Sequence, residues 1–227
     1  MTVIRDARGT PPRKARRAPV RMQDPNGTRR NILEIATDEF ANKGYSGARV
    51  DDIAARTSTS KRMIYYYFGD KQRLFIAVLE QAYARIRQIE AALDLAHVEP
   101  ETALRTMVGF TFDYQNANEA FIRLVMVENI HHGVHLARSG AIEGLNSPVI
   151  AILHDLCQRG QQEGLFRNDI DEVDLHMSIS ALCFFNVANR ATFSRIFNRA
   201  MGTPEALARR REIVIDTIMR YVKRGPE

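Results

Sequence analysis

The segment from Arg49 to Lys71 constrains the fold most, because it contains two short helical patterns separated by a polar break. Residues 50–54 place apolar side chains at the spacing of one helical face. Residues 57–60 (TSTS) interrupt that pattern, and residues 61–68 (KRMIYYYF) begin a second one. Two short helices joined by a tight polar turn, the second both basic and aromatic, are typical of a helix-turn-helix unit.

Helical periodicity continues along the rest of the chain, and no alternating pattern of useful length predicts a strand. We therefore expect an all-α fold of about nine helices, with residues 129–139 as an irregular connection. The first helix is expected to stop at Gly44, and the eighth to continue to about Phe197. The expected helix starts are Thr28, Val50, Lys61, Asp70, Pro100, Asn118, Ser147, Asp171 and Thr203.

These helices predict two domains behind a polar arm. Residues 1–27 contain almost no periodic apolar residues and are expected to form a disordered basic arm. Residues 28–74 should form the helix-turn-helix domain, and residues 75–227 a second helical domain. A long helix from Asp70 to about Leu95, apolar on one side, is expected to join the two domains.

The net charge of +5 is concentrated in the arm. Residues 1–27 hold seven Lys or Arg side chains and two Asp, whereas the other 200 residues hold 25 basic and 25 acidic side chains. A basic arm raises the affinity for polyanions and makes that affinity depend on salt. The arm is therefore either a solvated tail or a segment that follows DNA, and its four prolines argue against an amphipathic targeting helix.

Several classes of protein are excluded by what the chain lacks. Cys157 and Cys183 both lie in apolar helical patterns, so no disulfide framework is indicated and a cytoplasmic location fits. No apolar run approaches the ~20 residues that span a bilayer. No nucleophile elbow, Walker, dinucleotide-binding or zinc-protease motif occurs, so neither an enzyme nor a cofactor is expected. His131 and His135 have the spacing of two metal ligands on a helix, but a structural role is preferred and no metal is predicted.

The second short helix has the chemistry to read DNA. Duplex DNA offers phosphates for positioning and major-groove base edges for sequence. Arg62 can bind guanine O6 and N7 together, which is worth about 1–3 kcal/mol of discrimination, and Met63 can contact a thymine methyl group. Ile64 and Phe68 are expected in the core instead. The candidate base contacts are Thr59, Ser60, Lys61, Arg62 and Met63.

The second domain contains polar residues within otherwise apolar helices. A buried polar group costs free energy unless it is paired, so each needs either a bound small molecule or a partner in the protein. A carboxylate held by Arg190 or a histidine is one such small-molecule contact. The candidate ligand contacts are Tyr114, Arg123, Glu128, Asn129, His131, His132, His135, Asn186, Asn189 and Arg190.

The helix expected after Asp171 is apolar around most of its circumference, so it must be covered on all sides. Either a partner subunit or the rest of the monomer can provide that cover. The final helix, from Thr203 to about Val222, could pair with it, and two helices from each subunit would then form a four-helix interface. We therefore expect a homodimer through the last two helices.

Residues 30–74 resemble the TetR/AcrR-type bacterial transcription regulators. The all-helical remainder agrees in helix number and order with the ligand-binding and dimerisation domain of that family. Residues 129–197 also resemble a subgroup that includes repressors of aromatic-acid catabolism of the nicotinate-degradation type. The matching residues are Ile32, Leu33, Ala36, Phe40, Gly44, Tyr45, Asp52, Ile53, Ala54, Ser60, Lys61, Tyr65, Phe68, Lys71 and Leu74.

The resemblance also implies roles for residues at the end of the helix-turn-helix unit. Tyr65, Tyr66 and Tyr67 are expected mainly against the DNA backbone, and Lys71 is expected to contact a phosphate from the start of the long helix. No membrane is implied as a partner.

The chain departs from the family pattern in the turn and at the preceding cap. Ser58 replaces the turn glycine and Thr59 the valine after it, so the turn must either tolerate a side chain or avoid positive φ. Ala48 stands where a Ser or Thr usually caps the helix, and the cap and phosphate contact are expected to pass to Arg49.

The predicted function is that of a repressor that binds a palindromic operator in double-stranded DNA as a dimer. A small-molecule effector, aromatic or carboxylate-bearing, is expected to release it. Two alternatives stay open at this point: a DNA-binding regulator without a small ligand, and an enzyme built on a helical bundle.

Overall fold

The computed structural model describes residues 25–225, and all of its regular elements are helical. Within this range it contains ten α-helices and two short 3-10 turns, which confirms the all-α prediction. One isolated β-bridge, between Phe166 and Lys223, is the only β interaction among the described residues. The helices are α1 (Pro25–Gly47), α2 (Val50–Thr57), α3 (Lys61–Phe68), α4 (Lys71–Ala91), α5 (Pro100–Ala117), α6 (Glu119–Ile130), α7 (Ile142–Gln162), α8 (Glu172–Ala188), α9 (Arg190–Ile196) and α10 (Pro204–Val222), with 3-10 turns η1 (Leu95–His97) and η2 (Leu136–Arg138).

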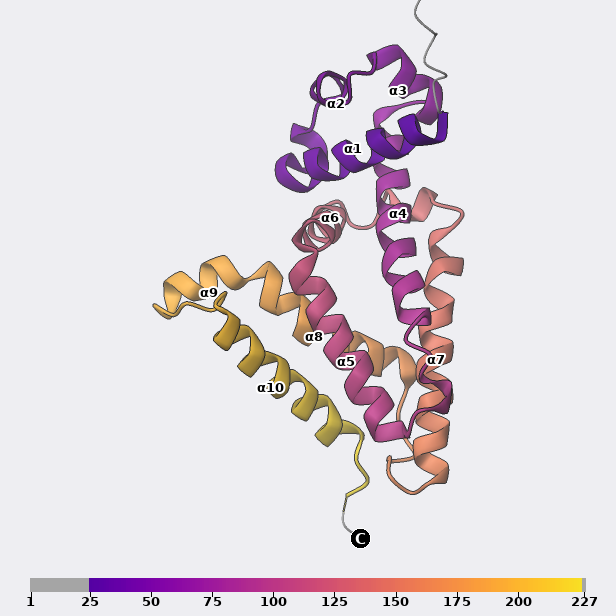
Figure 1. The fold of residues 1–227 in the computed structure, drawn as a ribbon, viewed down its shortest axis with the longest axis vertical. Helices are drawn as coiled ribbons and strands as arrows, with labels where there is room; N and C mark the ends of the chain where they lie inside the picture. The colour runs from indigo at the N-terminus through magenta and orange to yellow at the C-terminus, as the bar shows by residue number, and fades with distance from the viewer. Residues whose placement is uncertain (1–24, 226–227) are drawn as a thin grey trace, which may run out of the picture.

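The helices form a small N-terminal domain and a larger second domain (Figure 1). Helices α1, α2 and α3 gather at one end, and α4 runs from that end along α7. Helix α6 lies beneath α1, while α5, α8 and α10 pack together farther from the N-terminal domain. The second domain thus contacts the first through both α4 and α6.

Each domain has its own hydrophobic core. The N-terminal core contains Ile64 and Phe68 from α3, as predicted, together with Leu74 and Phe75 from α4. Leu124 of α6 also belongs to this core, which ties the second domain to the first. The larger core is built from the buried faces of α5, α7, α8 and α10. Burying each large side chain stabilises the fold by about 1.5–3 kcal/mol, so the two cores hold their helices in fixed positions.

The first helix begins earlier than predicted. It starts at Pro25 rather than Thr28, because proline is favoured in the first turn of a helix, where its missing N–H is not needed. Residues 25–27 therefore belong to α1, and the rest of the predicted arm lies outside the described residues. Gly44 has φ 70° and interrupts the helical backbone near the predicted stop, although helical turns resume up to Gly47.

Helix α7 also begins earlier than predicted. Ser147 and Pro148 were expected to open it, but the helix starts at Ile142 and includes Pro148. The hydroxyl oxygen of Ser139 accepts hydrogen bonds from the backbone N–H groups of Ala141 and Ile142, each at 3.2 Å. The N–H groups at the start of a helix have no partner within the helix, so these bonds allow α7 to begin before Pro148.

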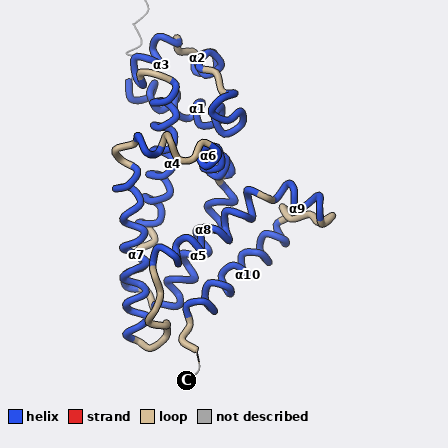
Figure 2. The backbone as a smooth tube through the Cα atoms, turned by 180° about the vertical axis from the view of Figure 1, so that it is seen from behind, coloured by secondary structure: helices blue, strands red, loops and turns tan. Residues whose placement is uncertain are grey.

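The predicted helix that reaches Phe197 is in fact two helices. Helix α8 ends at Ala188, and Asn189 has φ −106° and ψ 3°, which redirects the chain into α9. Asparagine competes for backbone hydrogen bonds and is a poor residue for a helix interior. Helix α9 and the turn after it project sideways between α8 and α10, as both views show (Figure 2). This split raises the helix number from nine to ten.

The outer face of α8 is apolar and exposed, and α10 adds the exposed Ile213 to a surface that is otherwise largely polar. Met177 and Phe185 of α8 are 61% and 44% exposed, and Ile213 of α10 is 44% exposed. The opposite face of α8 is buried in the core. None of the helices in residues 25–225 combines the length and apolar character required to cross a bilayer.

Candidate DNA-binding domain and interior cavity

The turn between α2 and α3 keeps a left-handed residue despite the absence of glycine. Ser58 has φ 51° and ψ 30°, so the turn tolerates a side chain at positive φ. The backbone N–H of Thr59 donates to the carbonyl of Ala54 at 3.2 Å, which closes the end of α2. A left-handed conformation costs a residue other than glycine roughly 1–2 kcal/mol. The turn therefore retains its usual shape at an energetic cost.

The first residues of α3 have different environments. Ser60 caps the helix, and its hydroxyl oxygen accepts from the N–H of Met63 at 3.2 Å. The ammonium of Lys61 lies 3.0 Å from the carboxylate of Asp51 on α2, and this hydrogen bond raises the pKa of Lys61. Arg62 is exposed and makes no polar contact with another described residue. Arg62 is thus the base-reading candidate with a fully available side chain.

The remaining α3 candidates differ in how far they are exposed to solvent. Tyr66 is 77% exposed, Tyr65 is partly exposed, and Tyr67 is half-buried against the N-terminal core. The rings of Tyr66 and Tyr67 meet edge to face with centroids 5.5 Å apart. Met63 is half-buried beside them. Tyr66 therefore has the freest hydroxyl of the three tyrosines.

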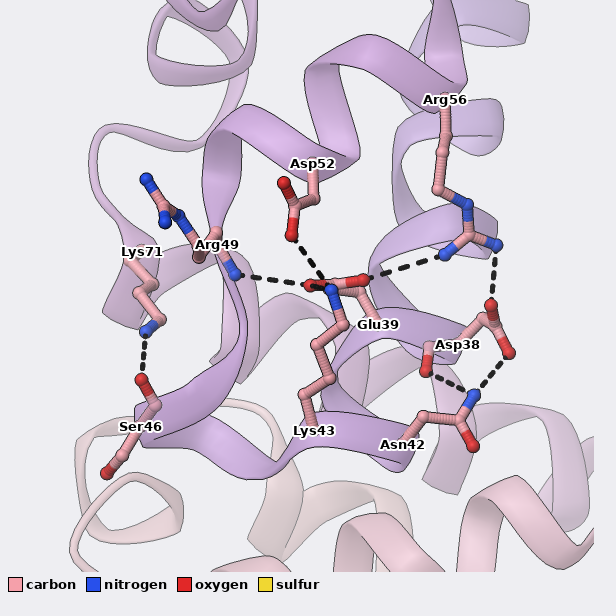
Figure 3. Close-up of polar contacts among 9 residues, drawn as sticks. All are labelled: Asp38, Glu39, Asn42, Lys43, Ser46, Arg49, Asp52, Arg56 and Lys71. Atoms are coloured by element: carbon pink, nitrogen blue, oxygen red, sulfur yellow. Dashed lines mark hydrogen bonds and ion pairs between the residues drawn. The ribbon is translucent and has the colours of Figure 1, made fainter.

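The cap of α2 comes from α1 rather than from Arg49. The backbone N–H of Arg49 donates to Glu39 Oε1 at 3.3 Å, and the Arg49 side chain makes no capping bond (Figure 3). Ala48 is buried, so this position offers no hydroxyl. The expected transfer of the cap to Arg49 is corrected accordingly, because a guanidinium has no acceptor. Its exposed guanidinium stays available for a phosphate.

Glu39 is the centre of a charged network that holds α1 against α2 (Figure 3). Its carboxylate is buried and lies 2.9 Å from Lys43 Nζ and 3.7 Å from the Arg56 guanidinium. Lys43 also pairs with Asp52 of α2 at 2.8 Å. A buried carboxylate requires such partners, because an unpaired buried charge is strongly unfavourable. The network therefore fixes the angle at which α2 presents the turn and α3.

Lys71, at the start of α4, is held against the end of α1. Its ammonium donates to the carbonyl of Ser46 at 3.4 Å (Figure 3) and lies 4.9 Å from the ring centre of Tyr45. Burial lowers the pKa of the Lys71 ammonium. The side chain is positioned near the backbone that precedes α2, where a phosphate contact would replace one long hydrogen bond.

A buried carboxylate joins the two domains near this point. Glu128 of α6 accepts hydrogen bonds from the backbone N–H groups of His135 and Leu136 at 2.8 and 2.9 Å, and from His135 Nδ1 at 2.7 Å. The His135 ring packs on Tyr45 and Phe75, with centroids 4.4 and 4.9 Å apart. The loop after α6 is therefore anchored in the N-terminal domain.

An interior cavity of about 300 Å³ lies between α4, α5, α6, α7 and α8. Most of its wall is apolar, with three aromatic rings, and this composition is typical of small-molecule sites. The lining residues are Tyr83, Ile86, Arg87, Glu90, Met107, Thr111, Gln115, Phe121, Val125, Asn146, Val149, Leu153, His176, Ile179, Ser180 and Phe184.

The wall contains one ion pair and one histidine. Arg87 Nη1 contacts the Glu90 carboxylate, and Arg87 Nε donates to Asn146 Oδ1 at 3.2 Å. Burial raises the pKa of Glu90, and Arg87 opposes that shift. Burial, assisted by the charge of Arg87, lowers the pKa of His176 to about 4, so this imidazole is neutral at pH 7.

None of the ten ligand contacts predicted from the sequence lines this cavity. Asn186, Asn189 and Arg190 line a separate surface hollow of about 350 Å³ between α8, α9 and α10. Arg123 and Asn129 are exposed and bonded within α6, to Glu119 and to the carbonyl of Val125.

The other five candidates lie elsewhere in the second domain. Tyr114 is buried, and its ring packs on Phe110 and Phe121. Glu128 and His135 form the interdomain contact, His131 packs on Tyr45, and His132 is exposed. No group of three or more His, Cys, Asp or Glu side chains in residues 25–225 has a geometry that could hold a metal ion.

Both domains match family models of known regulators. Residues 32–78 match the model for "Bacterial regulatory proteins, tetR family", and residues 100–218 match that for "Tetracyclin repressor-like, C-terminal domain". The chain belongs to the TetR family of transcriptional regulators. This confirms the resemblance inferred from the sequence and makes the protein a non-enzymatic regulator. Membership implies binding to operator DNA and a dimeric ligand-binding C-terminal domain.

This TetR-family chain is similar to curated repressors along most of its length. It is 36% identical to the HTH-type transcriptional repressor NicS of Pseudomonas putida, over 93% of this chain and 100% of that protein. It is 30% identical to the HTH-type transcriptional repressor SCO4008 of Streptomyces coelicolor, over 70% of this chain and 78% of that protein.

Solved structures of more distant regulators share the fold. The fatty acid degradation regulator FadR from Bacillus halodurans superposes with a TM-score of 0.63 at 16% identity, over 88% of this chain and 97% of that one. The ketosteroid transcriptional regulator KstR2 of Mycobacterium tuberculosis superposes with a TM-score of 0.62 at 18% identity, over 87% of this chain and 95% of that one. At these identities the likeness concerns the fold alone.

Proposed function

We propose that the protein is a repressor that binds a palindromic operator as a homodimer and leaves DNA when a small molecule fills the cavity between α4 and α8. Repression is supported by two relatives that are transcriptional repressors, NicS, matched over its full length, and SCO4008, matched over 78% of its length. The remaining steps rest on the geometry of the described residues.

DNA reading is assigned to α3 and the positions around it. The exposed guanidinium of Arg62 would read a base edge, and Tyr66 and Arg49 would contact the backbone. One α3 covers only a few base pairs, so a stable complex needs two copies. In a two-fold dimer the half-sites would lie about 34–36 Å apart, or a multiple of that distance, and the operator would be a palindrome.

Dimerisation is assigned to the exposed apolar face of α8 together with the adjoining part of α10 around Ile213. Met177, Phe185 and Ile213 present large apolar side chains on these two helices. A patch of this kind on a two-fold dimer is self-complementary, and two helices from each subunit would form a four-helix interface.

The observation that carries the release mechanism is that α4 belongs to both sites. Its first residue is Lys71, beside the end of α1, and Tyr83, Ile86, Arg87 and Glu90 on the same helix line the cavity. Arg87 lies sixteen positions after Lys71, which corresponds to roughly 24 Å along the helix axis. A ligand that prefers a shifted α4 would therefore favour a different spacing of the two α3 helices, and DNA would be released by population shift.

A mobility-shift titration tests this proposal. Purified full-length protein is mixed with DNA from upstream of its own gene, with scrambled DNA of equal composition as control. A panel of aromatic and fatty acids, alcohols and amides is then added. We expect a specific shift at moderate salt that at least one compound reverses. A specific shift that no compound reverses would favour a regulator without a small ligand, and no specific shift would contradict operator binding.

The dimer is tested by light scattering after chromatography. Phe185→Asp should convert a dimer to a monomer, because a charge would enter the apolar interface. Val134→Asp is the matched control, since Val134 is a similarly exposed apolar residue outside α8 and α10. Equal behaviour of the two variants would contradict the assigned interface.

A further inference from the structure

The charges that line the interior cavity are already balanced. Arg87 is its only Lys or Arg, and Glu90 its only Asp or Glu, among the described lining residues. The two side chains contact each other and are nearly inaccessible to solvent. The side-chain oxygen of Asn146 accepts a hydrogen bond from Arg87 Nε. The amide nitrogen of Asn146 donates to the carbonyl of Ile142 at 3.0 Å.

An ionic ligand would unbalance this pair. A carboxylate beside Arg87 would compete with Glu90 for one guanidinium and bring two negative charges together, and an ammonium beside Glu90 would do the same with two positive charges. His176 adds no positive charge, because its imidazole is neutral at pH 7. The cavity therefore favours an uncharged occupant.

Most other polar groups of the wall are bonded inside the protein. The hydroxyl of Thr111 donates to the carbonyl of Met107 at 2.9 Å. The hydroxyl of Ser180 and Nδ1 of His176 lie 3.2 Å apart and form a hydrogen bond. These contacts leave few groups that would require a ligand.

Gln115 on α5 differs from these residues, because its buried side-chain oxygen lacks a partner in residues 25–225. Its side chain lines the cavity and is only 5% exposed, yet its Oε1 has no hydrogen-bond partner among the described residues. A buried acceptor without a donor is unfavourable, so a ligand that supplies one O–H or N–H group would restore the missing bond. The same cavity wall contains the aromatic rings of Tyr83, Phe121 and Phe184.

We propose that the cavity binds a compact, uncharged and largely apolar molecule whose hydroxyl or N–H group donates a hydrogen bond to Gln115 Oε1. The proposal deepens the function proposed above, since this molecule would be the effector that acts on α4. Binding itself does not depend on DNA, so it is tested separately. The proposal departs from a carboxylate-bearing effector held by Arg190, which lies outside this cavity.

Three probes of nearly equal size separate the alternatives. 2-Naphthol is uncharged and has one donor, 2-methoxynaphthalene is uncharged without a donor, and 2-naphthoate is an anion. Binding to full-length protein is measured by isothermal titration calorimetry at pH 7. We expect 2-naphthol to bind roughly tenfold more tightly than 2-methoxynaphthalene, because only the former satisfies the buried acceptor. We expect 2-naphthoate to bind more weakly than either.

Variants of Gln115 test the assigned acceptor. Gln115→Leu and Gln115→Met remove it with little change in volume, and both should abolish the preference for 2-naphthol over 2-methoxynaphthalene. Gln158→Leu, the same change at an exposed position on α7, should keep the preference. Thermal unfolding of each ligand-free variant shows whether it is folded before the titration.

Three results would overturn the proposal: binding of 2-naphthoate at least as tight as that of 2-naphthol, the same preference in wild type and both Gln115 variants, or no binding of any probe. The mobility-shift titration can fail without contradicting the ligand site. If 2-naphthol binds with the expected dependence on Gln115 but does not release DNA, the ligand site stands and effector control through α4 is contradicted.

Discussion

The ammonium of Lys61 lies 3.0 Å from the carboxylate of Asp51, so the first residue of α3 is tied to α2 when DNA is not bound. Both side chains are exposed, and the hydrogen bond raises the pKa of Lys61. The same lysine is a candidate DNA contact. A phosphate or base edge must therefore compete with Asp51 for this ammonium, and the pair limits the contribution of Lys61 to binding.

Asp51→Asn should consequently raise DNA affinity several-fold, because it frees Lys61 and removes a negative charge beside the DNA. The slope of log K against log salt should steepen by about one unit. Fluorescence anisotropy at several salt concentrations measures both. Asp155→Asn, which breaks a similar pair with Arg159 on α7, is the control. Weaker binding by Asp51→Asn would mean instead that Asp51 positions Lys61 for DNA.

The left-handed turn residue gives a stability prediction. Ser58→Gly should stabilise the protein by about 1 kcal/mol, since glycine adopts φ 51° without steric cost. Urea unfolding of the two proteins at pH 7 measures the difference. Ser46→Gly, at an exposed position without positive φ, should give no stabilisation. A destabilised Ser58→Gly variant would show that the Ser58 side chain contributes more than its backbone strain costs.

Base reading and phosphate contact can be separated by two alanine variants. Arg62→Ala should relax sequence preference at one operator position, with a loss of about 1–3 kcal/mol for the preferred base. Lys71→Ala should weaken all sequences alike and reduce the salt slope by about one unit. Anisotropy titrations with the operator and single-base variants distinguish the two patterns. The assigned roles would be contradicted if both variants changed sequence preference equally.

The local parts of this structure follow from the sequence, because single residues determine them. Asp70, Asp171 and Thr203 were predicted to lie at helix starts, and each side chain accepts a hydrogen bond from the first turn of its helix. Such caps act over three residues, so an isolated sequence contains the whole signal.

The features that sequence reasoning missed depend on residues far apart in the chain. Glu39 reaches the N–H of Arg49 from another helix, so no local pattern at Ala48 reveals the cap. The interior cavity combines side chains from five helices. Arg87 and Glu90 lie on a helix interpreted only as a connection, and Gln115 sits among other polar residues at the end of α5. An i, i+3 ion pair on the apolar side of α4 was the one available signal.

The buried imidazole in the cavity predicts a dependence of stability on pH. The pKa of His176 falls from its ordinary value of 6.5 to about 4 in the folded protein, so the unfolded chain binds a proton that the folded protein resists. Stability should therefore decrease as pH falls from about 6.5 towards 4. His176→Gln should lose less stability over this interval, by about 1–2 kcal/mol after allowance for partial exposure. Urea unfolding at pH 7, 5.5 and 4.5 tests this, and parallel curves would contradict it.

The interdomain contact between Glu128 and His135 predicts different effects for two substitutions. Glu128→Met leaves the N–H groups of His135 and Leu136 and the imidazole Nδ1 without their buried acceptor, and should destabilise the protein by about 3 kcal/mol. Glu128→Gln keeps one oxygen for the two backbone N–H groups, and its amide can donate to Nδ1 in the other tautomer, so the loss should be below about 1.5 kcal/mol.

These losses should also affect communication between the domains, because His135 packs on Tyr45 and Phe75 of the N-terminal domain. For each folded variant, the effector concentration that releases half of the DNA is compared with its affinity for the effector alone. Glu128→Met should weaken release more than it weakens binding of the effector, whereas Glu128→Gln should leave their ratio close to that of wild type. If both substitutions changed stability equally and left the ratio unchanged, the contact would serve neither as the main buried acceptor nor as part of the path between cavity and α3.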